Sequence, residues 1–220
     1  GSVMNWVKKK QETEKRGLKY IHANEIYLTK GVKYSYPKIE EEFDTVSELE
    51  SFISNREDVV FDRSKVKLVR ERDNYHFVTI AKNEAGVKEL NKLTSQSFDK
   101  TDGHNYYNPR FLFDELKSTS DNIIMTSACL ASPIWRLYNN AYEKINGVVR
   151  IKDQRLHEEY EDLMQFFVNN KHRMFFEVQY HTHPEQIKFN QMLYDLSKDT
   201  GIPLIAGTDT HCLNQQHAKG

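Results

Sequence analysis

Residues 174–211 read MFFEVQYHTHPEQIKFNQMLYDLSKDTGIPLIAGTDTH, and this stretch decides the expected fold. The apolar run at 174–179 predicts a buried strand, and residues 184–200 predict a helix that opens with Pro184, a residue favoured at the first helical position. A second strand is expected at 203–206, where the chain again turns apolar. A strand, a helix and a strand in this order are typical of a parallel sheet covered by helices.

The same alternation of strands and helices extends over the rest of the chain. Residues 30–72 are charged and irregular, and we interpret them as a surface insertion in which Thr45 or Ser47 caps a short helix that runs through residue 55. No Gly/Pro/Ser-rich linker divides the chain, so the sequence predicts a single α/β domain over residues 1–220. The further strands are expected at 18–23, 26–28, 75–81 and 122–126, and the further helices at 84–95, 133–145 and 153–169.

Composition limits the classes of function. The 31 basic residues meet 32 acidic ones, for a net charge of −1, so any contact with nucleic acid must be local or must come from parts of a longer protein. The two cysteines, Cys129 and Cys212, argue against a disulfide framework and for a reducing cytoplasm. The apolar runs are too short to span a bilayer, and no phosphate-binding loop, dinucleotide fingerprint or nucleophile elbow occurs.

Polar side chains follow three of the expected strands, at the strand ends where α/β folds collect functional residues. Glu25 follows the strand at 18–23, Cys129 follows the strand at 122–126, and Asp209 and His211 follow the strand at 203–206. An Asp-x-His pair in an extended segment points a carboxylate and an imidazole the same way, as metal ligands require. The spacing leaves plainer alternatives open: a loop aspartate that caps a turn, a solvated histidine, a surface glutamate, and a cysteine that packs as a small hydrophobe.

Three histidines add to this pattern. His181 and His183 repeat the two-residue spacing after the strand at 174–179, and His76 lies at the head of the strand at 75–81, where it is equally explained as a half-buried packing residue. Each signal is weak alone. Together, carboxylate, imidazole and thiolate groups from separate strand ends predict a metal site.

Five segments of the chain resemble one family, in the family's own order. Residues 19–28 extend the likeness more loosely towards the start of the chain. The five segments are HFVTIAKN (76–83), YYNPR (106–110), IIMTSACLA (123–131), FEVQYH (176–181) and GIPLIAGTDTHCL (201–213). On these segments, the chain is similar to the metal-binding PHP domain of bacterial-type (C-family) DNA polymerase III alpha subunits.

The resemblance implies a PHP-type distorted (β/α)7 TIM-like barrel whose rim holds up to three Zn²⁺ or Mn²⁺ ions. It assigns six metal ligands. His183 is not one of them, because it occupies a position that the family does not reserve for histidine. His76 begins its expected strand, so either this strand runs antiparallel to its neighbours or its boundary is wrong. The six ligands are Glu25, His76, Cys129, His181, Asp209 and His211.

The chain also departs from the family pattern. The family's early His-x-His motif and Asp-His-Gly turn are absent, and the Asp-His would fall immediately before Gly1. We therefore expect an N-terminally truncated PHP domain that lacks its first strand or strands and holds fewer metal ions than the complete domain, or none.

The resemblance implies the PHP portion of a replicative DNA-directed DNA polymerase (a nucleotidyltransferase), with polymerase domains beyond residue 220. In the complete protein, a metal-dependent phosphoesterase site would give 3′→5′ exonuclease activity. Its partners would be DNA, other polymerase domains and replisome subunits, with no membrane. Two alternatives stay open: a structural module of the polymerase, and a phosphoesterase of the histidinol-phosphatase type.

Overall fold

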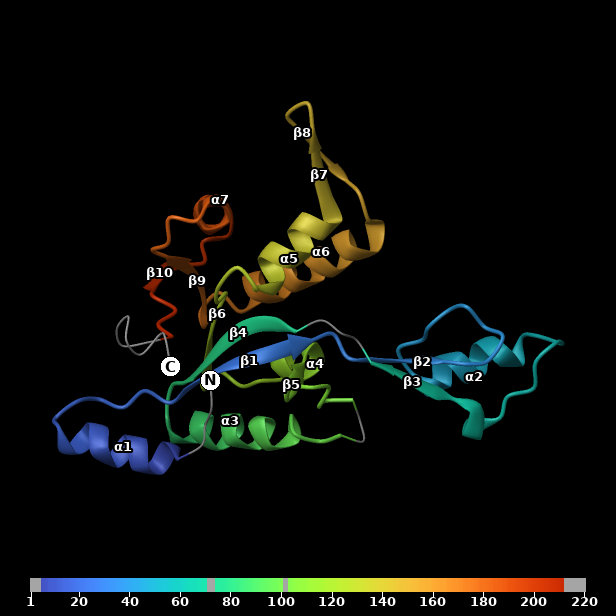
Figure 1. The fold of residues 1–220 in the computed structure, drawn as a ribbon, viewed down its shortest axis with the longest axis horizontal. Helices are drawn as coiled ribbons and strands as arrows, with labels where there is room; N and C mark the ends of the chain where they lie inside the picture. The colour runs from blue at the N-terminus through green and yellow to red at the C-terminus, as the bar shows by residue number, and fades with distance from the viewer. Residues whose placement is uncertain (1–4, 71–73, 101–102, 212–220) are drawn as a thin grey trace. The chain divides into compact units, whose positions relative to one another are not determined.

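A computed structural model describes residues 5–70, 74–100 and 103–211 of the chain (Figure 1). The chain divides into two compact units. The first unit comprises Gly1–Ile26, Tyr75–Val87 and Ser120–Gly220, and the second comprises Tyr27–Asn74 and Lys88–Thr119. No described helix has the length and apolar character needed to cross a membrane.

The first unit contains most of a parallel-rich sheet, which confirms the expected α/β class. Its strands follow the order β10-β9-β6-β4-β1, and β9 pairs in parallel with both β10 and β6. Strand β4 instead runs antiparallel to β6, with Val78 opposite Thr126. Residue 76 therefore lies at the edge where β6 ends, and the antiparallel alternative is the correct one. The strands are β1 (Ala23–Thr29), β4 (Tyr75–Ala81), β6 (Ile123–Thr126), β9 (Met174–Gln179) and β10 (Leu204–Gly207).

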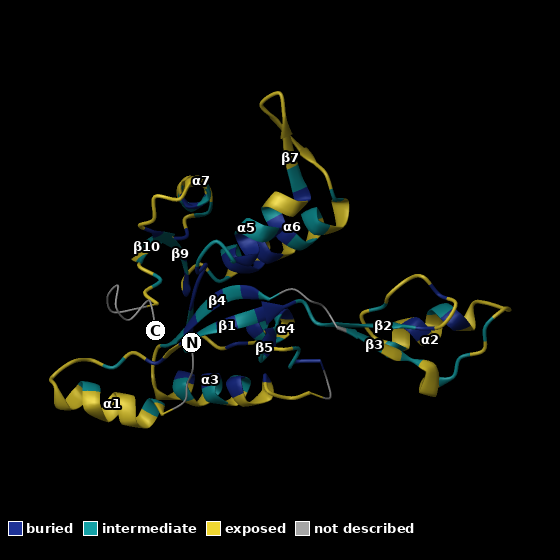
Figure 2. Cartoon of the chain, in the orientation of Figure 1, coloured by how far each residue is buried: buried dark blue, intermediate teal, exposed yellow. Residues whose placement is uncertain are grey.

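The helices of the first unit begin where the sequence supplies caps. Ser132 and Asp153 accept hydrogen bonds from Ile134 N and Leu156 N at the starts of α5 and α6. Helices α5 and α6 pack against each other, and Figure 2 shows their buried sides in dark blue. Helix α7 packs on β9 and β10, as the strand–helix–strand pattern predicts. The helices are α1 (Trp6–Lys15), α5 (Pro133–Ala141), α6 (Gln154–Asn169) and α7 (Pro184–Thr200).

Two expected elements of the first unit are wrong. The helix expected at 133–145 ends at Ala141, and the chain continues into the hairpin of β7 (Tyr142–Ile145) and β8 (Val148–Ile151). Asn146 and Gly147 both have positive φ, 50° and 83°, as the tight turn between antiparallel strands requires. The strand expected at 18–23 is also displaced: β1 begins at Ala23, so Glu25 lies within a strand and not after one.

The second unit contains the whole segment that was expected to be an insertion, residues 30–72. Strands β2 (Val32–Ser35) and β3 (Lys67–Arg70) pair antiparallel, and α2 (Val46–Ser54) begins at Thr45 with a capping box, one of the two caps expected. These elements enclose a small hydrophobic core of their own, in which Tyr36, Ile39, Leu49 and Ile53 are buried. The unit also contains η1 (Arg63–Lys65), β5 (Arg110–Leu112), which pairs in parallel with the end of β1, and α4 (Phe113–Lys117); α3 (Glu84–Gln96) runs from the first unit into the second.

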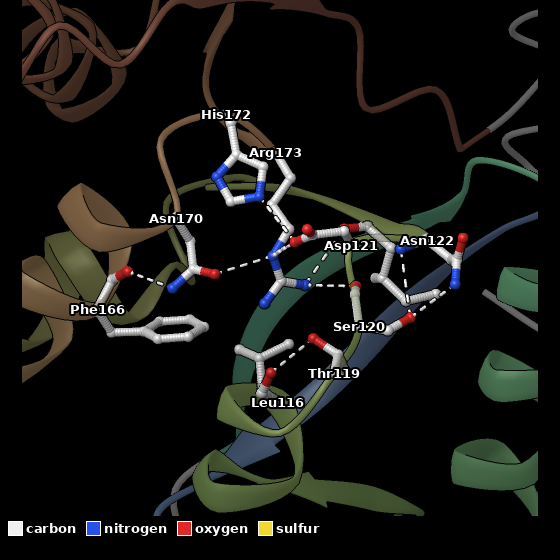
Figure 3. A network of polar contacts seen from close by, with 10 residues as sticks. Leu116, Thr119, Ser120, Asp121, Asn122, Phe166, Asn170, His172 and Arg173 are labelled. Atoms are coloured by element: carbon white, nitrogen blue, oxygen red, sulfur yellow. Dashed lines mark hydrogen bonds and ion pairs between the residues drawn. The ribbon is translucent and has the colours of Figure 1, made fainter.

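A buried arginine joins the segments that precede β6 and β9 in the first unit (Figure 3). Arg173 is only 4% exposed, and its guanidinium donates to Asn170 Oδ1 at 2.9 Å, to Ser120 O at 2.9 Å and to Ile123 O at 3.4 Å. The carboxylate of Asp121 lies 3.6 Å from its Nε. These bonds fix where β9 begins relative to β6.

We predict that Arg173→Met lowers the free energy of unfolding by about 3 kcal/mol, because it removes a buried donor from three acceptors at once. Urea denaturation of the two proteins measures the difference. Asp121→Asn is the matched control, because the Asp121 side chain is 77% exposed and its loss should matter far less. Equal losses for both variants would contradict the assignment of the stabilising role to the buried guanidinium.

Candidate metal centre

Three of the residues singled out from the sequence meet in the first unit. One ligand atom each of Glu25, His76 and Cys129 lies within 4.8 Å of the other two. Glu25 Oε1 is 3.0 Å from His76 Nδ1, and Cys129 Sγ is 3.5 Å from the same nitrogen. All three residues are partly buried.

The sheet brings these residues together from distant parts of the chain. Because β4 is antiparallel to β6, His76 at its start lies beside the loop that follows β6, and His76 N donates to Ala131 O at 3.0 Å in this loop. Ala128 has a left-handed φ of 54°, which turns the chain directly before Cys129. Ser132 N then donates to Cys129 O at 2.8 Å and closes the turn.

The geometry distinguishes a metal centre from a nucleophilic triad. In a Cys–His–acid triad, the imidazole accepts from the thiol with one nitrogen and donates to the acid with the other. Here Glu25 and Cys129 both approach Nδ1 of His76, so the imidazole cannot relay a proton between them in that way. A carboxylate, an imidazole and a thiol this close to one another instead form a group that could hold a metal ion.

The electrostatics of the group fit the same interpretation. The hydrogen bond from His76 lowers the pKa of the Glu25 carboxyl, against the opposing effect of burial. Hydrogen bonds to Cys129 and then to Glu25 raise the pKa of His76 to about 9. The site thus favours positive charge at Nδ1 of His76.

Asp209 and His211 lie on the loop that follows β10. The side chains of Asp209 and His211 are 27% and 74% exposed, and His211 Nδ1 is 2.7 Å from the backbone oxygen of Asp209. His211 also contributes to the lowered pKa of Glu25, so its imidazole lies within electrostatic range of that carboxylate. Among the described residues, however, the group of three converging ligand atoms does not include Asp209 or His211.

The remaining histidines differ in their surroundings. His181 is exposed two residues after β9, and it too lies outside the group of three. His183 is the N-cap of α7, where its Nδ1 accepts from Glu185 N at 3.3 Å. The two-residue spacing of this pair therefore has a local structural explanation at His183.

Glu177 of β9 was not among the residues expected at the site. Its carboxylate accepts a hydrogen bond from Thr126 Oγ1 at 2.6 Å and lies against Gly207. Thr126 begins the segment that leads to Cys129, and Gly207 begins the segment that leads to Asp209. The one signal in the sequence is a glycine at the end of a strand, which is typical of a close approach by another group.

Comparison with known proteins agrees with these observations. The family model for the PHP domain matches residues 1–181. The chain is 28% identical over 218 residues to DNA polymerase III subunit alpha of Borreliella burgdorferi, covering 99% of this chain and 15% of the relative. The subunits of Chlamydia pneumoniae and Campylobacter jejuni are 32% and 30% identical, with 70% and 77% of this chain covered. The chain spans only 13–15% of the length of these three relatives.

We predict a characteristic pH dependence for the metal-free centre. The lowered pKa of Glu25 contributes to the free energy of unfolding at pH values above 4.5, the ordinary pKa of a glutamate. This contribution is lost as the pH falls through the lower pKa of the folded state. The raised pKa of His76 also contributes to the free energy of unfolding. This contribution is fully present below pH 6.5, the ordinary pKa of histidine, and is lost as the pH rises through about 9. Urea denaturation in chelator should therefore show the largest difference between wild type and His76→Gln between about pH 4.5 and 6.5. A difference that stays constant up to pH 9 would contradict the assignment.

Proposed function

The chain belongs to the PHP domain family, and from this premise we propose that it is the PHP portion of a replicative DNA polymerase III alpha subunit, with a divalent metal ion held by Glu25, His76 and Cys129. The observation that carries the proposal is the approach of a carboxylate and a thiol sulfur to the same imidazole nitrogen. Because the chain spans a small part of its relatives, nucleotide addition would belong to other regions of a longer protein.

The donor set suits the ions that the proposal requires. Carboxylate oxygen, imidazole nitrogen and thiolate sulfur are all Zn²⁺ ligands, and the soft sulfur of Cys129 favours Zn²⁺ over the harder Mn²⁺ at this position. Three protein ligands leave a coordination position for water or substrate. A bound ion supplies Lewis-acid chemistry, by polarising a phosphoryl oxygen and lowering the pKa of a bound water.

Further ligands would complete a larger centre. We assign Asp209 and His211 to it, because their loop leaves the sheet at the edge where β4 begins and because His211 acts electrostatically on Glu25. His181 follows β9 at this edge and is the remaining candidate. With these residues the complete domain would hold up to three ions.

The proposed domain is a single distorted (β/α)7 barrel, with residues 30–72 as an insertion. The parallel-rich sheet of the first unit supports this interpretation, and so does the family match, since residues 1–181 draw on both compact units.

The proposed activity of the complete protein is metal-dependent 3′→5′ exonucleolytic cleavage of DNA, close to the other polymerase domains and replisome subunits. Glu25, His76 and Cys129 would hold the ion, which would supply Lewis-acid chemistry for the scissile phosphate, and Asp209 with His211 would extend the centre from the loop after β10. With a net charge of −1, the chain would hold DNA by local contacts and not by a general basic surface. Its two cysteines fit a reducing cytoplasm.

A second candidate is a structural ion in a non-catalytic module. Glu25, His76 and Cys129 come from three segments separated by about 50 residues each, and an ion among them would crosslink β1, β4 and the loop after β6. Such a crosslink stabilises the folded chain whether or not the site cleaves DNA.

We predict that Zn²⁺ raises the melting temperature of the chain and that chelator reverses the effect. At a free concentration of 100 times Kd, the stabilisation is about 2.7 kcal/mol. Cys129→Ser should weaken Zn²⁺ binding by more than about 100-fold, since it removes a ligand and not merely an outer-shell partner. Isothermal titration measures the affinity, with Glu158→Gln as an exposed control. Equal affinity in Cys129→Ser and wild type would contradict the proposed centre.

For catalysis, we predict that Asp209→Asn and His211→Ala in the full-length polymerase abolish exonuclease activity and leave polymerase activity intact. Release of the 3′-terminal nucleotide from labelled DNA measures the first, and primer extension measures the second. If chelation lowers the melting temperature of the chain but neither variant changes exonuclease activity, the structural candidate is correct.

A further inference from the structure

The carboxylate of Glu177 lies between the two segments that carry the candidate ligands. We infer that Glu177 is a positioning residue, which holds the Cys129 segment and the Asp209–His211 segment in place for the metal centre. This inference rests on the proposed function. It goes beyond it by assigning a role to a side chain that is not itself one of the six candidate ligands.

On the Cys129 side, Glu177 is bonded through both its side chain and its backbone. Thr126 Oγ1 donates to Glu177 Oε2 at 2.6 Å, and Glu177 N donates to Ser127 Oγ at 2.8 Å. Thr126 Oγ1 in turn accepts from Ala128 N at 3.3 Å, so the hydroxyl links the carboxylate to the turn that presents Cys129. The left-handed backbone at Ala128 is held by this chain of bonds.

On the other side, the carboxylate is packed against Gly207. A Cβ atom at position 207 would collide with Glu177 Oε1 and with the carbons that bear it, so any larger residue there would displace the Glu177 side chain. Gly207 is the last residue of β10 and stands two residues before Asp209. The path of the chain into the Asp209–His211 loop thus depends on the place of the Glu177 carboxylate.

The carboxylate itself is anchored. Gln179 Nε2 donates to Glu177 Oε1 at 3.1 Å, and Gln179 is buried with 3% exposure. The backbone of Gln179 exchanges hydrogen bonds with Asn190 of α7, at 3.2 and 2.8 Å. Both carboxylate oxygens therefore accept protein hydrogen bonds, which fix the carboxylate between the Cys129 segment and the Asp209–His211 segment.

Co²⁺ binding to the 220-residue chain tests the inference, because a thiolate–Co²⁺ charge-transfer band that is lost in Cys129→Ser, and therefore does not come from Cys212, reports the contact with Cys129. Glu177→Ala should weaken Co²⁺ binding by about 10- to 100-fold, the usual effect of losing an outer-shell partner. Glu177→Gln, which keeps the shape of the side chain and one acceptor, should restore part of the affinity. Glu158→Ala, an exposed glutamate of α6, should bind as wild type does.

Gly207→Ala provides a second, independent variant. It should weaken Co²⁺ binding in the presence of Glu177 but cost nothing further in the Glu177→Ala background, because the group that the new methyl meets is gone. Circular dichroism and thermal melts in chelator check that the variants fold. If Glu177→Ala does not fold, Glu177→Gln and Gly207→Ala carry the test.

Wild-type affinity and an unchanged charge-transfer band in Glu177→Ala would overturn the inference. The inference also fails if Gly207→Ala costs as much affinity without Glu177 as with it. A wild-type chain that shows no Cys129-dependent band would overturn the proposed metal centre itself, which separates the two failures.

Discussion

The reversal of a single strand determines the candidate site. In a purely parallel sheet, only the residues after each strand reach the edge where the strands end. Because β4 runs antiparallel to β6, a residue at its beginning reaches the same edge, and His76 meets Cys129 there. If β4 ran parallel, His76 would lie at the opposite edge of the sheet and the group of three would not form.

The β6–β9 pair that supports this edge is short, and side-chain hydrogen bonds hold it at both ends. Its register pairs Met125 with Met174 and Thr126 with Phe175. Before the strands, the buried guanidinium of Arg173 bonds to the carbonyls that lead into β6. At the end of β6, Thr126 donates to the carboxylate of Glu177 in β9. Short strands are prone to slip in register, and a slip of one residue would turn every side chain to the other face. The hydrogen bonds of Arg173 and Glu177 oppose such a slip.

A secondary-structure element can be predicted from the sequence where the contacts that determine it are local. The strand–helix–strand pattern of residues 174–211 is local, and the strands and helix appear there as expected. The hairpin after Ala141 also has a local signal, Asn146-Gly147 between β-branched residues, but helical periodicity through residue 145 favours a longer helix and competes with this turn signal. The displaced start of β1 shows the usual uncertainty of element boundaries.

The role of Glu177 shows the other limit. Nothing within a few residues of Glu177 distinguishes it from an ordinary strand carboxylate, since its partners Thr126 and Gly207 are about 50 and 30 residues away. Residue types and a family resemblance could nominate Glu25, His76 and Cys129 because these side chains are chemically distinctive ligands. A supporting carboxylate has no such signature, so only its contacts reveal it.

The geometry also indicates how the three residues stay together without an ion. Glu25 Oε1 and Cys129 Sγ both lie close to Nδ1 of His76, and the raised pKa of His76 keeps a proton there near neutral pH. This proton gives the Glu25 carboxylate a positively charged partner. A metal ion in the proposed centre would take the position of this proton.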